Sequence, residues 1–225
     1  MEKPVHYLQR TFLSLMLLGL IIGAVAVVIQ KVRHYIKSTV ILSLIPQDTR
    51  NPVNPLLIKA FEYIQIPHTP HGIAIDFGAG YEGADTAYLL KKGYQVIAID
   101  QSKEKLQVLG SKKEIYAYSS RLRTIASRFE DLYWGTIPLV DLFIAFHSLS
   151  GKQVEDFPKV WKNIVAHIKP GGFFVGDLPP LFKQDLLKIF DGFEMLYVDE
   201  VNALSNSDTL PQEGILIYSV IARKK

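Results

Sequence analysis

The chain has 225 residues, 48% of them hydrophobic, which is enough for one sizeable α/β domain with a short appendage but not for two full domains. Its formal charge of +3 belongs to residues 1–50, which hold six Lys/Arg against two acids, whereas residues 51–225 hold nineteen against twenty. The near-neutral globular part gives no indication of a nucleic-acid partner, and the lack of cysteine excludes disulfides, thiolate nucleophiles and Cys-ligated zinc.

Near the start of the chain, residues 11–30 form an uncharged apolar run of twenty residues. As a helix rising about 1.5 Å per residue, this run would span the roughly 30 Å hydrocarbon core of a bilayer. We therefore predict a single transmembrane helix over about 11–30. A cleaved signal peptide, with small residues at Ala24 and Ala26, and a buried core helix are the alternatives.

The basic residues that flank this run predict its orientation. Lys31, Arg33 and Lys37 follow it, whereas only Lys3 and Arg10 precede it. Because Lys and Arg gather on the cytoplasmic side of a membrane span, the following domain is predicted to be cytoplasmic. The sequence therefore predicts that the chain binds the membrane as a partner, through a single-pass anchor.

Proline and loop-forming residues predict the domain organisation. We predict an N-terminal membrane anchor over 1–37, a linker with a covering helix over 38–71, and the main domain over 72–225. The covering helix is expected at 56–65. His68 and His71 lie in the loop that follows it, but no third ligand has suitable spacing, so no metal site is predicted.

Residues 73–90, with the sequence IAIDFGAGYEGADTAYLL, organise the main domain. A short apolar run breaks at Gly78, Gly80 and Gly83 and resumes with helical spacing, which predicts a strand, a glycine turn and a helix. The turn satisfies G-x-G-x-x-G, a pattern of dinucleotide-binding folds that is weak evidence alone. Asp76 and Glu82 make it anionic, which favours a cationic ligand over a pyrophosphate.

The stretch DFGAGYEGADTAYLLKKGYQVIAIDQS resembles motif I and the second strand of class I S-adenosylmethionine-dependent methyltransferases. Its GADTAYLLKKGYQVIAID part is most similar to the small tellurite-resistance-type methyltransferases. The resemblance implies S-adenosylmethionine as the cofactor. The predicted binding residues in this stretch are Asp76, Gly78, Ala79, Gly80, Tyr81, Glu82, Gly83, Asp100 and Gln101.

Asp100 ends the apolar run 95–100, which predicts a central parallel strand. It lies 22 residues after Gly78, where an acid at a strand end can accept both hydroxyls of a ribose. In the alternative, Asp100 only caps the next helix, although Ser102 is the better candidate for that cap.

A third strand is predicted at 122–127, followed by Arg128. In the family that this chain resembles, an acidic residue near this position contacts the adenine amino group. Arginine departs from that pattern, so the backbone amides near Phe129 and Glu130 are the predicted adenine contacts.

The remaining elements complete an α/β pattern. A fourth strand is predicted at 139–148 and an amphipathic helix at 153–168. The run IKPGGFFVGD resembles the turn into the fifth strand of class I methyltransferases. One helix and two final strands complete the sequence-based prediction, at 182–190, 193–201 and 215–222.

These elements predict an α/β fold with a single Rossmann-like methyltransferase sheet behind the N-terminal transmembrane helix. The resemblance implies seven strands in the order 3-2-1-4-5-7-6, with the last strand antiparallel. A hairpin-like end of the chain, without another crossover helix, fits that order and would not be expected of a dinucleotide-binding half-domain.

Methyl transfer needs a general base only if the nucleophile of the acceptor is protonated. His147, at the end of the fourth predicted strand, is the first candidate and Asp177, at the end of the fifth, is the second. In the alternative, His147 only lines the pocket or is a hydrogen-bonded structural residue.

The predicted membrane anchor suggests a small acceptor that is hydrophobic or membrane-associated. A catalytically silent methyltransferase-like membrane scaffold and an NAD-dependent oxidoreductase are the alternative functions.

Overall fold

The computed structural model describes residues 52–64, 72–149, 157–179, 183–201 and 217–225, all within the compact unit Gln47–Lys225. The predicted transmembrane helix lies outside these residues, as do His68 and His71. None of the helices in the described ranges is both long and apolar enough to cross a bilayer.

A seven-stranded sheet with the order β3-β2-β1-β4-β5-β7-β6 forms the centre of the unit. The first five strands are parallel and β7 is antiparallel to both of its neighbours, which confirms the predicted order and the antiparallel last strand. The strands are β1 (Ile73–Phe77), β2 (Gln95–Asp100), β3 (Leu122–Ala126), β4 (Val140–Ala145), β5 (Ile168–Asp177), β6 (Phe193–Val201) and β7 (Ile217–Lys224).

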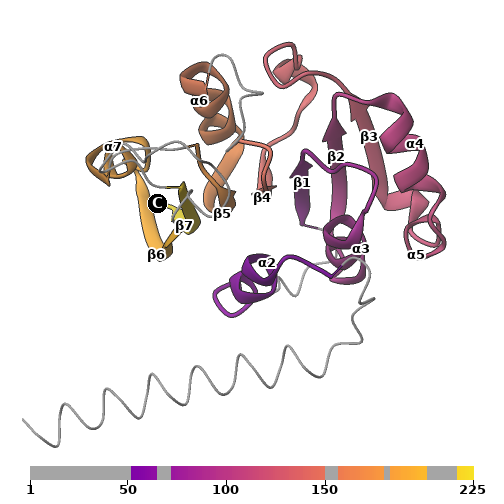
Figure 1. Cartoon of the computed structure of the whole chain (residues 1–225), viewed down its shortest axis with the longest axis horizontal. Helices are drawn as coiled ribbons and strands as arrows, with labels where there is room; N and C mark the ends of the chain where they lie inside the picture. Colours follow the sequence, from indigo (N-terminus) through magenta and orange to yellow (C-terminus); the bar gives the residue numbers. More distant parts are fainter. Residues whose placement is uncertain (1–51, 65–71, 150–156, 180–182, 202–216) are drawn as a thin grey trace, which may run out of the picture. The chain divides into compact units, whose positions relative to one another are not determined.

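Helices cover both faces of the sheet (Figure 1). Residues of α2, α3, α4 and α5 share one apolar cluster with one face of the sheet, and residues of α6 and α7 share a second cluster with the other face. Burial on both faces explains why the central strands are continuous apolar runs. The helices are α2 (Pro55–Ala60), α3 (Ala84–Lys91), α4 (Lys103–Ser111), α5 (Lys113–Tyr116), α6 (Phe157–His167) and α7 (Lys183–Ile189).

Two strand pairings determine the geometry near the site. Gly176 of β5 pairs with Ala145 of β4, and a Cβ on this glycine would lie 2.3 Å from the Ala145 carbonyl oxygen. A side chain at position 176 would therefore force the two strands apart. On the other side of β5, Asp177 pairs directly with Ser219 of β7. The side chains of a directly opposed antiparallel pair lie on the same face and within reach of each other.

Two predicted elements are shorter in the structure. The fourth strand was expected at 139–148 but ends at Ala145, because the chain then bends and His147 adopts a left-handed backbone with φ 55°. The covering helix was expected at 56–65 but ends at Ala60. There the backbone changes to i→i+3 hydrogen bonds, as from Phe61 N to the Ile58 carbonyl.

Candidate active site

A cavity of about 420 Å³ opens at the carboxyl ends of β1 and β4. This position agrees with the rule that open α/β sheets bind ligands beyond the carboxyl ends of their strands. Five parts of the chain contribute to its wall: the end of β1 with the glycine turn that follows it, the start of α3, the segment that leads into α2, Lys105 of α4, and the residues after β4. The lining residues are Pro52, Asn54, Pro55, Asp76, Gly78, Ala79, Gly80, Tyr81, Glu82, Gly83, Ala84, Asp85, Lys105, Phe146 and His147.

The glycine turn is shaped by close backbone packing. Gly78 has φ 90°, and its N–H, like that of Ala79, donates to the Ile99 carbonyl of β2. A Cβ on Gly78 would lie 2.5 Å from the Cβ of Ser148, so position 78 admits no side chain. The buried Ser148 hydroxyl has no hydrogen-bond partner among the described residues. The turn therefore presents bare backbone to the cavity.

Asp100 braces this turn from the end of β2. Its Oδ2 accepts a hydrogen bond from Gly80 N at 3.0 Å, and its Oδ1 accepts one from Ser102 N at 2.8 Å. Ser102 is the cap of α4, since its hydroxyl accepts from Lys105 N as predicted. Asp100 thus connects the glycine turn to the helix start but, like Gln101, is not itself in the cavity wall.

Asp76 and Asp85 form a partly buried acidic pair beside the turn. Burial raises the pKa of Asp76 to about 7; the Asp85 carboxylate adds to the effect, and the hydrogen bond from the Thr86 hydroxyl opposes it. Burial also raises the pKa of Asp85 to about 6, against the hydrogen bond that it accepts from Asn54 N at 2.8 Å. Both carboxyls therefore lack a counter-charge strong enough to offset their loss of hydration.

The charge of the cavity wall is predominantly negative. Asp76, Glu82 and Asp85 line it, whereas Lys105 is the one lysine or arginine among the described lining residues. Within a cavity of low dielectric constant, such a wall favours a cationic group and repels an anion. The prediction of a cationic ligand from the glycine-turn sequence thus agrees with the charge of the folded site.

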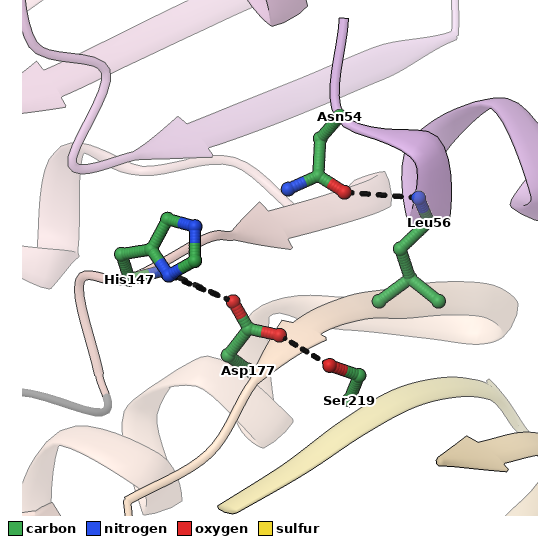
Figure 2. A network of polar contacts seen from close by, with 5 residues as sticks. All are labelled: Asn54, Leu56, His147, Asp177 and Ser219. Atoms are coloured by element: carbon green, nitrogen blue, oxygen red, sulfur yellow. Dashed lines mark hydrogen bonds and ion pairs between the residues drawn. The ribbon is translucent and has the colours of Figure 1, made fainter. Parts of the chain in front are cut away.

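His147, which lines the cavity, lies beside Asp177 (Figure 2). The Nδ1 atom and the backbone N of His147 each lie 3.3 Å from Asp177 Oδ2. Asp177 Oδ1 accepts a hydrogen bond of 2.7 Å from the Ser219 hydroxyl. The imidazole is 85% exposed and the carboxylate only 10%, so His147 is the accessible member of the pair.

The predicted adenine contacts lie away from the described cavity wall. The Phe129 ring is buried and stacks on Phe77 with 3.9 Å between ring centroids, so its side chain belongs to the core. Glu130 lies beside Arg128, whose Nε is 3.7 Å from the Glu130 carboxylate. The side chains of Phe129 and Glu130 do not line the described cavity, so a contact from these residues to adenine would have to come from their backbone.

Several lining residues were not predicted from the sequence. Asn54 and its proline neighbours lie at the start of a helix that was predicted only to cover the sheet, and Lys105 lies in the first turn of the helix that Ser102 caps. Asp85 directly follows the glycine motif, in the first turn of α3, and was not predicted either. No cluster of three metal-ligating side chains occurs within the described ranges.

Comparison with known proteins identifies the fold. Residues 75–176 match the family described as "Methyltransferase domain". No curated protein matches the chain. Among solved structures, TehB from Haemophilus influenzae aligns with a TM-score of 0.58 and 19% identity, over 77% of this chain and 63% of that one. This chain therefore spans less than two thirds of TehB.

Two further structures share the fold. Magnesium protoporphyrin IX methyltransferase (ChlM) from Synechocystis, solved with bound SAM, aligns with a TM-score of 0.56 and 15% identity, over 76% of each chain. A 1,6-didemethyltoxoflavin-N1-methyltransferase from Burkholderia thailandensis, solved with S-adenosylhomocysteine, aligns with a TM-score of 0.53 and 19% identity, over 75% of this chain and 78% of that one.

The family match runs from Ile75 within β1, through the glycine turn, to Gly176 near the end of β5, and the order of the sheet agrees with the fold of these structures. Residues 75–176 thus match a methyltransferase domain, and the described part of the chain has the fold of these solved methyltransferases.

Proposed function

We propose that the chain is a class I S-adenosylmethionine-dependent methyltransferase with S-adenosylmethionine as its cofactor. It would transfer the methyl group to a small, uncharged acceptor that is hydrophobic or membrane-associated, with His147 as the general base. The observation that carries this proposal is the single cavity wall that includes both the acidic glycine turn and the exposed imidazole. The turn suits the cationic methyl donor, and the imidazole can accept a proton from the acceptor.

The residues of this chain fit the cofactor. The bare backbone at Gly78 admits close approach, and Asp76 and Asp85 supply negative charge for the amino and sulfonium groups. Asp100 lies outside the described cavity wall and accepts two backbone hydrogen bonds, so the ribose hydroxyls are proposed to use the remaining lone pairs of its carboxylate. The backbone near Phe129 and Glu130 is the proposed partner of adenine. When bound, S-adenosylmethionine supplies an electrophilic methyl group on a positively charged sulfur.

The contribution of the protein is then mainly to position the two reactants and to accept one proton. Holding a nucleophile in line with an electrophile can supply much of the rate acceleration. A protonated nucleophile must also lose its proton, and His147 lies where a group in the cavity can reach it. The acidic wall opposes anionic acceptors, which supports an uncharged one.

The proposed acceptor can be tested with methyl-labelled S-adenosylmethionine. We expect the full-length chain, incubated with an extract of the source cells, to place the label in small molecules that partition into organic solvent. Label confined to protein, nucleic acid or water-soluble molecules would contradict the proposed acceptor. Cofactor binding without any transfer would instead support the catalytically silent scaffold.

We further propose that residues 11–30 anchor the chain in the membrane with the methyltransferase domain in the cytoplasm. The support is the uncharged apolar run and its basic flank. We expect the full-length chain to stay with membranes after alkaline carbonate extraction, and a variant with Leu18→Arg and Ile22→Arg to be released. Release of the unaltered chain would overturn the anchor without affecting the methyltransferase assignment.

Binding of the cofactor should weaken as the pH falls. The raised pKa of Asp76, about 7, means that this carboxyl becomes protonated below neutral pH and loses its attraction for a cation. If Asp76 must be ionised in the complex, the Kd should rise roughly 30-fold from pH 8 to pH 5.5. Asp85, with a pKa of about 6, should add to the loss near the acidic end. Titration calorimetry with S-adenosylmethionine measures this change, and a pH-independent Kd would contradict it.

A further inference from the structure

The contacts of Asp177 connect the last strand of the sheet to His147. Asp177 and Ser219 are directly paired residues of the antiparallel strands β5 and β7, and the Ser219 hydroxyl donates to Asp177 Oδ1 at 2.7 Å. The other carboxylate oxygen, Oδ2, faces the Nδ1 atom and the backbone N of His147. Both carboxylate oxygens are thus occupied, one on each side of β5 (Figure 2).

This arrangement makes Asp177 a poor general base. Its side chain is only 10% exposed, and its two oxygens already accept contacts from Ser219 and His147. A buried carboxylate that is held in this way is suited to orient a neighbouring group and not to take a proton from a ligand. The sequence-based suggestion that Asp177 is a second candidate base is therefore replaced by a positioning role.

The backbone of His147 depends on the same contact. With φ 55°, His147 is the one residue other than glycine in the described ranges that has a positive φ. Such a conformation is uncommon outside glycine and is held by its surroundings at functional sites. The approach of the His147 N–H to Asp177 Oδ2 stabilises this turn, and the turn places the imidazole in the cavity wall.

We propose that Ser219 and Asp177 are positioning residues that hold the His147 imidazole with its proton on Nδ1 and the lone pair of Nε2 free. This inference rests on the proposed role of His147 as base. The negative carboxylate beside Nδ1 favours the proton on that nitrogen, and the hydroxyl of Ser219 fixes the direction in which the carboxylate points.

The proposal also specifies the class of acceptor. A base with a fixed tautomer is useful when the nucleophile carries a proton at neutral pH, as an alcohol or phenol does, and is unnecessary for a thiolate. In the reaction, the acceptor hydroxyl loses its proton to Nε2 and its oxygen forms a bond to the methyl carbon. The bond between that carbon and sulfur breaks, with the electron pair remaining on sulfur. The products are a methyl ether, S-adenosylhomocysteine and a protonated His147.

The tautomer of His147 can be measured without knowing the acceptor. We would label the full-length chain with ¹⁵N-histidine and assign the His147 signals by their absence in His147→Asn. In the unaltered chain we expect the Nδ1–H tautomer to dominate in long-range ¹H–¹⁵N spectra. Ser219→Ala and Asp177→Asn should shift His147 towards a mixture of tautomers, whereas Ser219→Thr, which keeps the hydroxyl, should restore the original signals. A dominant Nε2–H tautomer in the unaltered chain would overturn the proposal.

A matched control separates orientation from folding. Ser111→Ala also removes a hydroxyl that donates one hydrogen bond, to the Val108 carbonyl, but at the exposed end of α4. It should leave the His147 signals unchanged, and thermal unfolding should show that Ser219→Ala remains folded. An unchanged His147 spectrum in folded Ser219→Ala would equally overturn the inference.

Methyl transfer distinguishes this inference from the proposed function. With labelled S-adenosylmethionine and the same cell extract, Ser219→Ala should lower the rate about tenfold with an unchanged Kd for the cofactor, as expected when one hydrogen bond to a charged group is lost. If His147→Asn leaves the rate unchanged, the proposed base is wrong whatever its tautomer. If His147→Asn lowers the rate but Ser219→Ala does not, only the positioning role is wrong.

Discussion

Asp76→Asn should stabilise the unliganded protein at pH 8 and weaken its binding of S-adenosylmethionine about 100-fold or more. Asp76 is 7% exposed, and burial raises its pKa to about 7. A carboxyl whose pKa is higher in the folded chain than in the unfolded chain contributes stability at low pH. That contribution is lost as the pH rises through the folded-state pKa. At pH 8 the ionised carboxylate therefore opposes folding.

Asparagine removes this buried charge and keeps an oxygen for the Thr86 hydroxyl, which donates to Asp76 Oδ2. We expect a gain of about 2 kcal/mol in the free energy of unfolding at pH 8, or roughly 4–8 °C in Tm for a domain of this size. The gain should shrink as the pH falls below 7 and vanish only near pH 3.8, the ordinary carboxyl pKa, where Asp76 is protonated in the unfolded chain as well. Thermal unfolding at both pH values tests this, with exposed Asp131→Asn as the control.

The buried charge of Asp76 that opposes folding is also the reason why Asp76→Asn should bind S-adenosylmethionine more weakly. A buried charge without a counter-charge is ready to meet a cation, and truncating one partner of such a pair typically costs about 2–5 kcal/mol. Titration calorimetry should therefore show a large rise in Kd for Asp76→Asn and none for Asp131→Asn. Unchanged binding, or a lower Tm at pH 8, would contradict the proposed role of Asp76.

His147→Asn should lower the rate of methyl transfer about 10²- to 10⁴-fold, the range expected for loss of a general base. Asparagine tolerates the left-handed backbone that His147 adopts at φ 55°, so the turn after β4 should persist. The Kd for S-adenosylmethionine should change little, because the acidic turn is intact. The rate is measured as transfer of labelled methyl into the organic-soluble fraction of a cell extract.

His167→Asn is the matched control for this variant. The His167 ring contacts the carbonyls of Asn163 and Trp134 at the end of α6, away from the cavity wall. We expect it to lower thermal stability and leave the transfer rate within about threefold of the unaltered chain, a loss below that of a single hydrogen bond to a charged group. Equal losses of activity in both variants would show that His147 acts through folding and not as a base.

The order of the sheet could be predicted because local signals and the resemblance pointed to the same fold. The central strands, such as 95–100, are apolar on both faces, and glycine marks the turn at 78–83. The end of the fourth strand was predicted three residues too late, at 148 instead of Ala145. The apolar pattern continues through Phe146, and sequence alone does not reveal that His147 takes a left-handed backbone.

The polar contacts of the site could not be predicted, because they join residues that are far apart in the sequence. Asn54 and Asp85 are 31 positions apart, and Asp177 and Ser219 are 42 positions apart. Their pairing depends on strand register and helix packing, which no local pattern encodes. Of the acidic pair, Asp76 was predicted as a binding residue and Asp85 was not. An acid in the first turn of a helix ordinarily indicates only a favourable contact with the helix dipole.

The segment Pro52–Pro55 has a practical consequence for anyone who shortens this protein. A fragment trimmed to the start of the family match at Ile75 would lose the hydrogen bond that the backbone N–H of Asn54 donates to Asp85. It would also lose the part of the cavity wall that Asn54 and its proline neighbours form. It would also lose β1 residues Ile73 and Ala74 and the buried Leu57 and Ala60 of α2. A recombinant catalytic fragment should therefore begin upstream of residue 52.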